Sequence, residues 1–159
     1  MALGPDITLK EGAKAPAFTA STNGGGQVSL KDFKGKHVVL FFYPKDDTPG
    51  WTKEACAFRD EHADFEKAKA VVLGVSGDST TKHDKFVAKY DLPFLLLTDE
   101  DQKIANKYGA WGLKKFMGKE YEGIHRISYL INPEGKIQKI WAKVKPEEHA
   151  AEVLAEIRG

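Results

Sequence analysis

The stretch that decides the fold reads Val38-Val39-Leu40-Phe41-Phe42-Tyr43-Pro44-Lys45-Asp46-Asp47-Thr48-Pro49-Gly50-Trp51-Thr52-Lys53-Glu54-Ala55-Cys56. Its first five residues form a continuous apolar run, which is typical of a strand that is buried on both faces. Thr48 followed by Pro49 is a helix-start signal, because a hydroxyl can cap the first amides and proline needs no amide partner there. The stretch therefore predicts a buried strand that leads into a helix, with Thr48 as the cap of that helix.

The residues after Pro49 carry a helical pattern. Apolar residues recur at steps of three and four, namely Trp51, Ala55, Phe58, His62 and Phe65. Charged residues lie off this stripe, namely Glu54, Arg59, Asp60 and Glu61. The pattern predicts a helix over about 49–67. Its N-terminus would present free amides and a partial positive charge, which favour a thiolate or a bound oxyanion.

Beyond this stretch, strands and helices alternate along the chain. We expect strands at 71–76, 94–97, 127–131 and 137–144, and helices at about 80–90, about 101–108 and from Pro146 onward. Gly24-Gly25-Gly26 indicates a turn between two short N-terminal strands. Residues 110–123 show no clear period. This alternation predicts an α/β sandwich, with a mixed sheet and helices on both faces.

Composition bounds the function. The 159 residues are 42% apolar and 30% charged, which predicts a single globular domain over 1–159. A net charge of +1 gives no reason to expect nucleic acid or an anionic membrane surface as partner. Apolar runs are too short for a membrane span, and no signal peptide is visible. One cysteine cannot form an internal disulfide, so we expect a reducing compartment, the cytoplasm.

The loop and the helix start resemble a known family. Pro44, Thr48 and residue 51 have the spacing of the peroxiredoxin motif Pro-x-x-x-Thr-x-x-Cys, except that residue 51 is Trp. The longer run 42–60 resembles the peroxiredoxin Q branch, also called bacterioferritin comigratory protein. That branch often carries a second cysteine five residues after the first, where Cys56 stands. The resemblance covers nearly the whole chain and implies a thioredoxin-like three-layer sandwich with extra N-terminal strands.

The resemblance also implies an activity. It is that of a thiol-dependent peroxidase, which reduces hydrogen peroxide and organic hydroperoxides with electrons from thioredoxin or a similar dithiol reductant. No cofactor and no metal are implied, and the protein would be a monomer or a weak homodimer. Trp51 occupies the peroxidatic position and Cys56 the resolving one. Pro44 would shield the pocket, Thr48 would hydrogen-bond within it, and the Arg126 guanidinium would hold the thiolate and polarise the peroxide.

Trp51 sets this chain apart from the family motif. An indole has no lone pair suited to attack on peroxide, so we expect a peroxidase form that this residue inactivates. One alternative is a non-catalytic peroxiredoxin-like binding or sensor module, and another is a redox protein that uses Cys56 alone. The residues also have plain structural explanations: Trp51 as a core aromatic, Cys56 as a small buried residue and Arg126 as a surface arginine.

Helix geometry leads to a conformational expectation. Residues five apart on an intact helix are roughly 8–9 Å apart at Cα, and a disulfide needs less than about 7 Å. A 51–56 bridge therefore requires the first helical turn to unwind. An indole overfills a site built for a thiol, so we expect an unwound or displaced first turn, with a regular helix beyond Cys56. The histidines show no spacing typical of zinc ligands, so we interpret them as surface or stripe residues: His37, His62, His83, His125 and His149.

Overall fold

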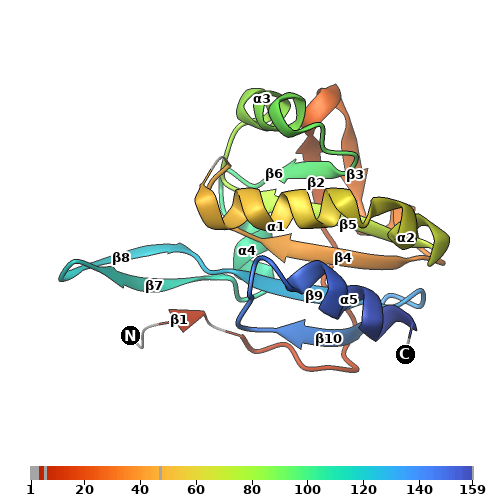
Figure 1. The fold of residues 1–159 in the computed structure, drawn as a ribbon. Helices are drawn as coiled ribbons and strands as arrows, with labels where there is room; N and C mark the ends of the chain where they lie inside the picture. Colours follow the sequence, from red (N-terminus) through yellow and green to blue (C-terminus); the bar gives the residue numbers. More distant parts are fainter. Residues whose placement is uncertain (1–3, 6, 47, 159) are drawn as a thin grey trace.

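The computed structural model describes residues 4–5, 7–46 and 48–158. Asp47 of the predicted loop lies outside the described residues, as do residues 1–3, Asp6 and Gly159. The main sheet has seven strands in the order β10-β9-β4-β5-β6-β2-β3 (Figure 1). These strands are β2 (Thr19–Thr22), β3 (Gln27–Ser29), β4 (His37–Phe42), β5 (Ala70–Ser76), β6 (Leu95–Thr98), β9 (Ile127–Ile131) and β10 (Ile137–Trp141). A second sheet, in the order β1-β7-β8, contains β1 (Gly4–Pro5), β7 (Trp111–Phe116) and β8 (Lys119–Ile124).

The helices are α1 (Pro49–Asp60), α2 (His62–Lys67), α3 (Thr80–Tyr90), α4 (Lys103–Lys107) and α5 (His149–Arg158). Two short 3-10 helices span Asn23–Gly25 and Leu30–Phe33. Strands β4, β5 and β6 run parallel, whereas β9 is antiparallel to β4 and β2 is antiparallel to β6. The sheet is therefore mixed, as the sequence predicted, and the N-terminal hairpin of β2 and β3 extends one edge.

Strand β4 divides the core between the two faces of the sheet. Its even-numbered side chains, Val38, Leu40 and Phe42, face a cluster that includes Phe18 and residues of α4. Its odd-numbered side chains face a second cluster, built from residues of α1, α2, α3 and α5. Figure 1 shows α1 running along β4. The predicted layer of helices on each face is confirmed, and it explains why every residue from Val38 to Tyr43 is apolar.

Two segments differ from the expected boundaries. The helix predicted over 49–67 is two helices, because Glu61 leaves the helical region with φ −96° and ψ 6°. The segment without a clear period contains the hairpin of β7 and β8, which Figure 1 shows projecting beyond the main sheet. Its tip exposes Phe116 and Met117, the latter 87% exposed. Among the described residues, none of the helices has the length and apolarity that crossing a membrane requires.

Candidate active site

The loop of residues 43–48 carries the chain from β4 to the N-terminus of α1. Thr48 occupies the N-cap position with an extended backbone, at φ −90° and ψ 147°. Its hydroxyl donates to the carbonyl oxygen of Lys45 at 2.9 Å, and its own carbonyl accepts from the Thr52 amide at 2.8 Å. The predicted cap position is therefore confirmed, but the predicted side-chain cap is wrong, because the hydroxyl is used within the loop.

Helix α1 is wound without a break from Pro49 to Asp60, and Trp51 in its first turn is completely buried. The indole stacks on Tyr43 with ring centroids 3.8 Å apart. Phe41 and Phe86 contact it at centroid distances of 5.6 Å and 6.2 Å. The predicted unwinding of the first turn is wrong, because aromatic rings from β4, the loop and α3 stabilise the indole inside the wound structure.

Arg126 lies just before β9 and packs its guanidinium over the first turn of α1. A Cβ atom on Gly50 would lie 2.7 Å from its Nη2, so any larger residue at position 50 would displace the guanidinium from this place. Its Nη1 is 3.7 Å from Oε2 of Glu54, one turn further along α1. The structure therefore brings Arg126 to the helix start that the motif identified, while the indole of Trp51 packs on the aromatic residues.

Glu54 is only 2% exposed, and the sequence pattern had placed it off the buried stripe. Burial raises the pKa of its carboxyl group to about 8, although the nearby Arg126 acts in the opposite direction. At 3.7 Å the ion pair does not offset the loss of solvation. One sequence signal was available: Glu54 lies three residues after Trp51, a spacing that places both on one helix face.

Two of the predicted site residues lie at the margin of this arrangement. Pro44 is half-buried at the start of the loop. Cys56, the only cysteine in the sequence, is half-buried in the middle of α1 with a free thiol. The buried face of α1 is made by Trp51, Glu54, Ala55 and Phe58. Cys56 is not part of this face, so the structure does not bring it to the Arg126 side chain.

Two histidines are completely buried, namely His83 and His149. His83 lies with Phe86 on the buried side of α3, so of the two expected alternatives the stripe residue is confirmed and the surface residue is wrong. His83 lies on α3, where its Nδ1 is 2.6 Å from Oδ2 of Asp46. Asp46 follows β4 and Asp78 follows β5, and the ends of adjacent parallel strands meet at one edge of a sheet. The sequence therefore held a signal for this cluster: an aspartate shortly after each of two predicted parallel strands.

His149 is the second buried histidine. It opens α5 on the apolar side that the sequence predicted for that helix. Its Nε2 is 2.7 Å from the Ser128 hydroxyl oxygen, and its ring contacts Phe41, Phe58 and Trp141. Burial lowers the pKa of His149 to about 4, so the imidazole is neutral at pH 7.

The chain is similar in sequence to known proteins. The AhpC/TSA family model matches residues 12–140. Peroxiredoxin Bcp of Bacillus subtilis is 50% identical over 152 residues, which cover 96% of this chain and 97% of that protein. Peroxiredoxin Bcp of Escherichia coli K12 is 46% identical over 146 residues, covering 92% of this chain and 94% of that protein.

Solved structures agree. Xanthomonas campestris peroxiredoxin Q superimposes with a TM-score of 0.86 at 38% identity, covering 96% of this chain and 97% of that one. A structure of the bacterioferritin comigratory protein from the same organism, studied for alkyl peroxide reduction, gives the same TM-score and identity over 96% and 98% of the two chains. The chain therefore belongs to the AhpC/TSA family, in the peroxiredoxin Q or Bcp branch of thiol-dependent peroxidases with a thioredoxin-like fold.

Proposed function

We propose that this chain retains the architecture of a peroxiredoxin Q site but does not reduce peroxide by the thiol route while Trp51 is in place. The observation that carries the proposal is the completely buried indole in the first turn of α1, at the position where the family motif has its cysteine. The single thiol of the sequence, on Cys56, lies outside the buried face of that helix.

The other site residues would serve a thiol at position 51. In a Trp51→Cys variant, the thiolate would attack one peroxide oxygen, and the other would leave as water or an alcohol after taking up a proton. The resulting sulfenic acid would condense with the thiol of Cys56 and release water. Arg126 would stabilise the thiolate and polarise the peroxide, Thr48 would hydrogen-bond within the site, and Pro44 would shield it.

The substrates and the reductant follow from membership of the peroxiredoxin Q branch. Hydrogen peroxide and organic hydroperoxides would be the oxidants, and a thioredoxin-type dithiol would reduce the 51–56 disulfide. Because residues five apart on a wound helix are roughly 8–9 Å apart at Cα, the first turn must open before that disulfide can form. We propose further that one domain over 1–159 carries all the steps in the cytoplasm, as a monomer or a weak homodimer.

Peroxide consumption tests this proposal directly. The chain, Trp51→Cys, Trp51→Ser and Trp51→Cys/Cys56→Ser are compared with thioredoxin, thioredoxin reductase and NADPH. We expect turnover only in Trp51→Cys, since Trp51→Ser removes the indole without supplying a thiol. If Trp51→Cys folds and stays inactive, the proposal is overturned in favour of a non-catalytic binding or sensor module. Turnover by the unsubstituted chain that Cys56→Ser abolishes would instead indicate a redox protein that uses Cys56 alone.

A further inference from the structure

His83 is fixed on one side by the central sheet. The imidazole is completely buried, and its Nε2 is 3.1 Å from the carbonyl oxygen of Leu97 in β6. A carbonyl oxygen can only accept, so Nε2 carries a hydrogen. The other nitrogen, Nδ1, is 2.6 Å from the carboxylate of Asp46, so this contact also contains a proton. The ring therefore has a defined orientation, with both nitrogens in hydrogen bonds.

Asp46 is the residue of the loop that this ring holds. Its Oδ2 contacts His83, and its Oδ1 accepts from the Tyr43 hydroxyl at 2.6 Å. Its backbone amide donates to Oδ2 of Asp78 at 2.7 Å, and that carboxylate also accepts from the Ser76 hydroxyl at 2.9 Å. Tyr43 directly follows β4, Asp78 lies just after β5 and His83 lies on α3, so Asp46 connects the loop before α1 to the ends of two strands and to a helix.

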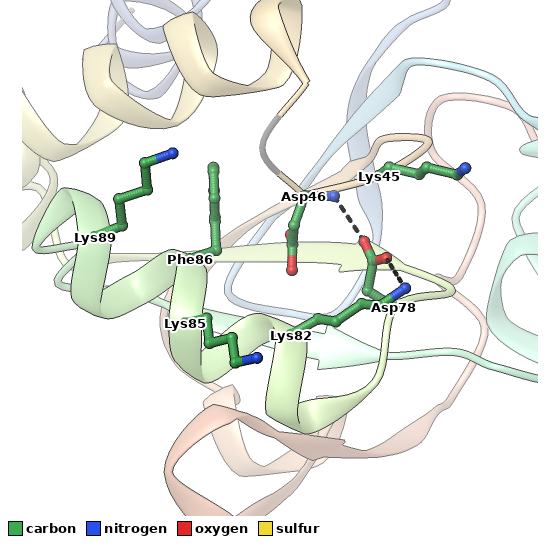
Figure 2. A pocket seen from close by; sticks show the side chains of 7 residues that line it. All are labelled: Lys45, Asp46, Asp78, Lys82, Lys85, Phe86 and Lys89. Carbon is green, nitrogen blue, oxygen red and sulfur yellow. Dashed lines mark hydrogen bonds and ion pairs between the residues drawn. The ribbon is translucent and has the colours of Figure 1, made fainter.

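The same three side chains could suggest a metal site, because ligand atoms of Asp46, Asp78 and His83 lie within 4.8 Å of one another. Two features oppose that interpretation. Both His83 nitrogens are already occupied by hydrogen bonds, so the ring offers no lone pair to a cation. The adjoining cavity has a volume of about 280 Å³. Four lysines are among the side chains that line it, namely Lys45, Lys82, Lys85 and Lys89 (Figure 2). The positive charge of these lysines would repel a metal cation, which favours a structural role for the carboxylates of Asp46 and Asp78.

Tyr43 connects this network to position 51. Its hydroxyl donates to Asp46, while its ring is the one on which Trp51 stacks. A shift of Asp46 therefore moves the aromatic ring against which residue 51 packs. It also moves the chain that enters Thr48 and the first turn of α1, two residues later.

We propose that His83 is a positioning residue for position 51: acting through Asp46, it fixes residues 43–46 of the loop and holds the first turn of α1 wound. Without His83, Oδ2 of the Asp46 carboxylate loses its hydrogen bond while the side chain is only 6% exposed, so outward movement of the loop is favoured because it returns this oxygen to water. That movement opens the helix start while the rest of α1 stays packed. This inference concerns the conformation of the chain as it stands, so it is independent of whether Trp51→Cys restores peroxidase activity.

Amide hydrogen exchange tests the proposal, in the full chain at pH 7. Thr52, Lys53 and Glu54 donate the first hydrogen bonds of α1, so their amides report opening of the first turn, whereas Phe58 and Arg59 report the rest of the helix. In His83→Gln we expect exchange at the first group to accelerate at least tenfold more than at the second. The comparison variant is His149→Gln, the same substitution at the other fully buried histidine, whose ring contacts Phe58; there, exchange at Phe58 and Arg59 should accelerate at least as much as at the first group.

A spectroscopic signature separates this role from a general loss of stability. In a Trp111→Phe/Trp141→Phe background, Trp51 is the only indole of the chain. His83→Gln should then shift its emission to longer wavelength and expose it to acrylamide, in protein that remains folded. Asp46→Asn should act in the same direction, and it serves as the test if His83→Gln does not fold.

Three results would overturn the proposal. One is equal acceleration throughout α1 in His83→Gln. Another is an unchanged first turn in both His83→Gln and Asp46→Asn. The third needs no variant: in the unsubstituted chain, the amides of Thr52–Glu54 would exchange at least a hundredfold faster than those of Phe58 and Arg59.

Discussion

The indole of Trp51 lies face to face with the phenol ring of Tyr43, with the ring centroids 3.8 Å apart and the planes 10° apart. In the family motif this position supplies a reactive sulfur, and in this chain it supplies buried aromatic surface. A buried tryptophan removes about 150–250 Å² of surface from water and dominates its local packing. The residue that sets this chain apart from the motif has therefore become part of the hydrophobic core.

Removing the indole should destabilise the protein. Trp51→Ala leaves a cavity against Tyr43, Phe41 and Phe86, and we expect a loss of about 3–5 kcal/mol in the free energy of unfolding. Urea denaturation followed by far-ultraviolet circular dichroism measures it. Trp141→Ala, at a half-buried tryptophan, should cost less. Equal losses in the two variants would mean that Trp51 contributes no more than a peripheral aromatic residue.

Glu54 should make stability fall as the pH rises. The folded state raises the pKa of this carboxyl group from its usual 4.5 to about 8, so the folded protein binds the proton more tightly than the unfolded chain does. Its contribution is therefore complete below about pH 4.5 and is lost as the pH rises to about 8. Relative to Glu54→Gln, the parent should lose roughly 3–5 kcal/mol across this window.

Unfolding by urea at several pH values between 4.5 and 8.5 measures this difference for parent and Glu54→Gln. The attraction of Arg126 acts only on the ionised carboxylate and is already part of the folded-state pKa, so the difference in slope between the two proteins reports the carboxyl group together with this contact. Glu147→Gln, at an exposed carboxylate paired with Lys53, is the control and should leave the slope unchanged. Parallel stability curves for the parent and Glu54→Gln would contradict the assignment.

His149 should make stability fall as the pH decreases, which is the opposite of the effect of Glu54. Burial depresses the pKa of its imidazole from 6.5 to about 4, so the unfolded chain binds the proton more tightly. Its contribution is present above about pH 6.5 and is lost as the pH falls toward 4. The parent should therefore lose roughly 3 kcal/mol relative to His149→Gln over this window. An NMR titration of the His149 ring checks the cause, and a midpoint near 6.5 would rule the explanation out. His62→Gln, at a half-buried histidine, is the control.

Gly50 should matter for activity in the Trp51→Cys background. In Gly50→Ala the new methyl group would overlap Nη2 of Arg126 and displace the guanidinium. We expect a higher pKa for the introduced thiol and peroxide reduction slower by roughly tenfold or more, although alanine favours the helix. Thiol titration and stopped-flow kinetics measure the two effects.

Arg126→Gln should reproduce both effects in that background, whereas Arg158→Gln, at an exposed arginine of α5, should produce neither. Adding Gly50→Ala to Arg126→Gln should then slow the reaction little further, because both substitutions remove the same interaction. Full additivity of the two losses would show that Gly50 acts through something other than Arg126.

The sequence predicted those features that depend on residues adjacent to one another along the chain. The apolar run before Tyr43 identified the buried strand, and Thr48-Pro49 identified the start of α1. The break at Glu61 was not predicted, because Phe58 and Phe65 keep a helical spacing across it. A change in the backbone angles of one residue does not alter that apolar pattern.

The errors at the site have a different origin, in contacts between distant segments. The unwound first turn was predicted from the size of the indole alone, while the rings that accommodate it come from β4, the loop and α3. Likewise, the hydrogen bond of His83 was not predicted, because its partner Asp46 lies 37 positions away in the chain. Such pairs become visible only when the parallel strands are placed side by side.

The tip of the β7–β8 hairpin carries one of the two methionine sulfurs that this sequence has besides the thiol of Cys56. Met117 is 87% exposed, and peroxide converts an exposed thioether into a sulfoxide. Conversion of Cys56 to a sulfenic acid adds the same single oxygen atom. Intact mass alone therefore does not distinguish oxidation of Cys56 from oxidation of a methionine after peroxide treatment, and peptide mapping assigns the oxygen to one residue.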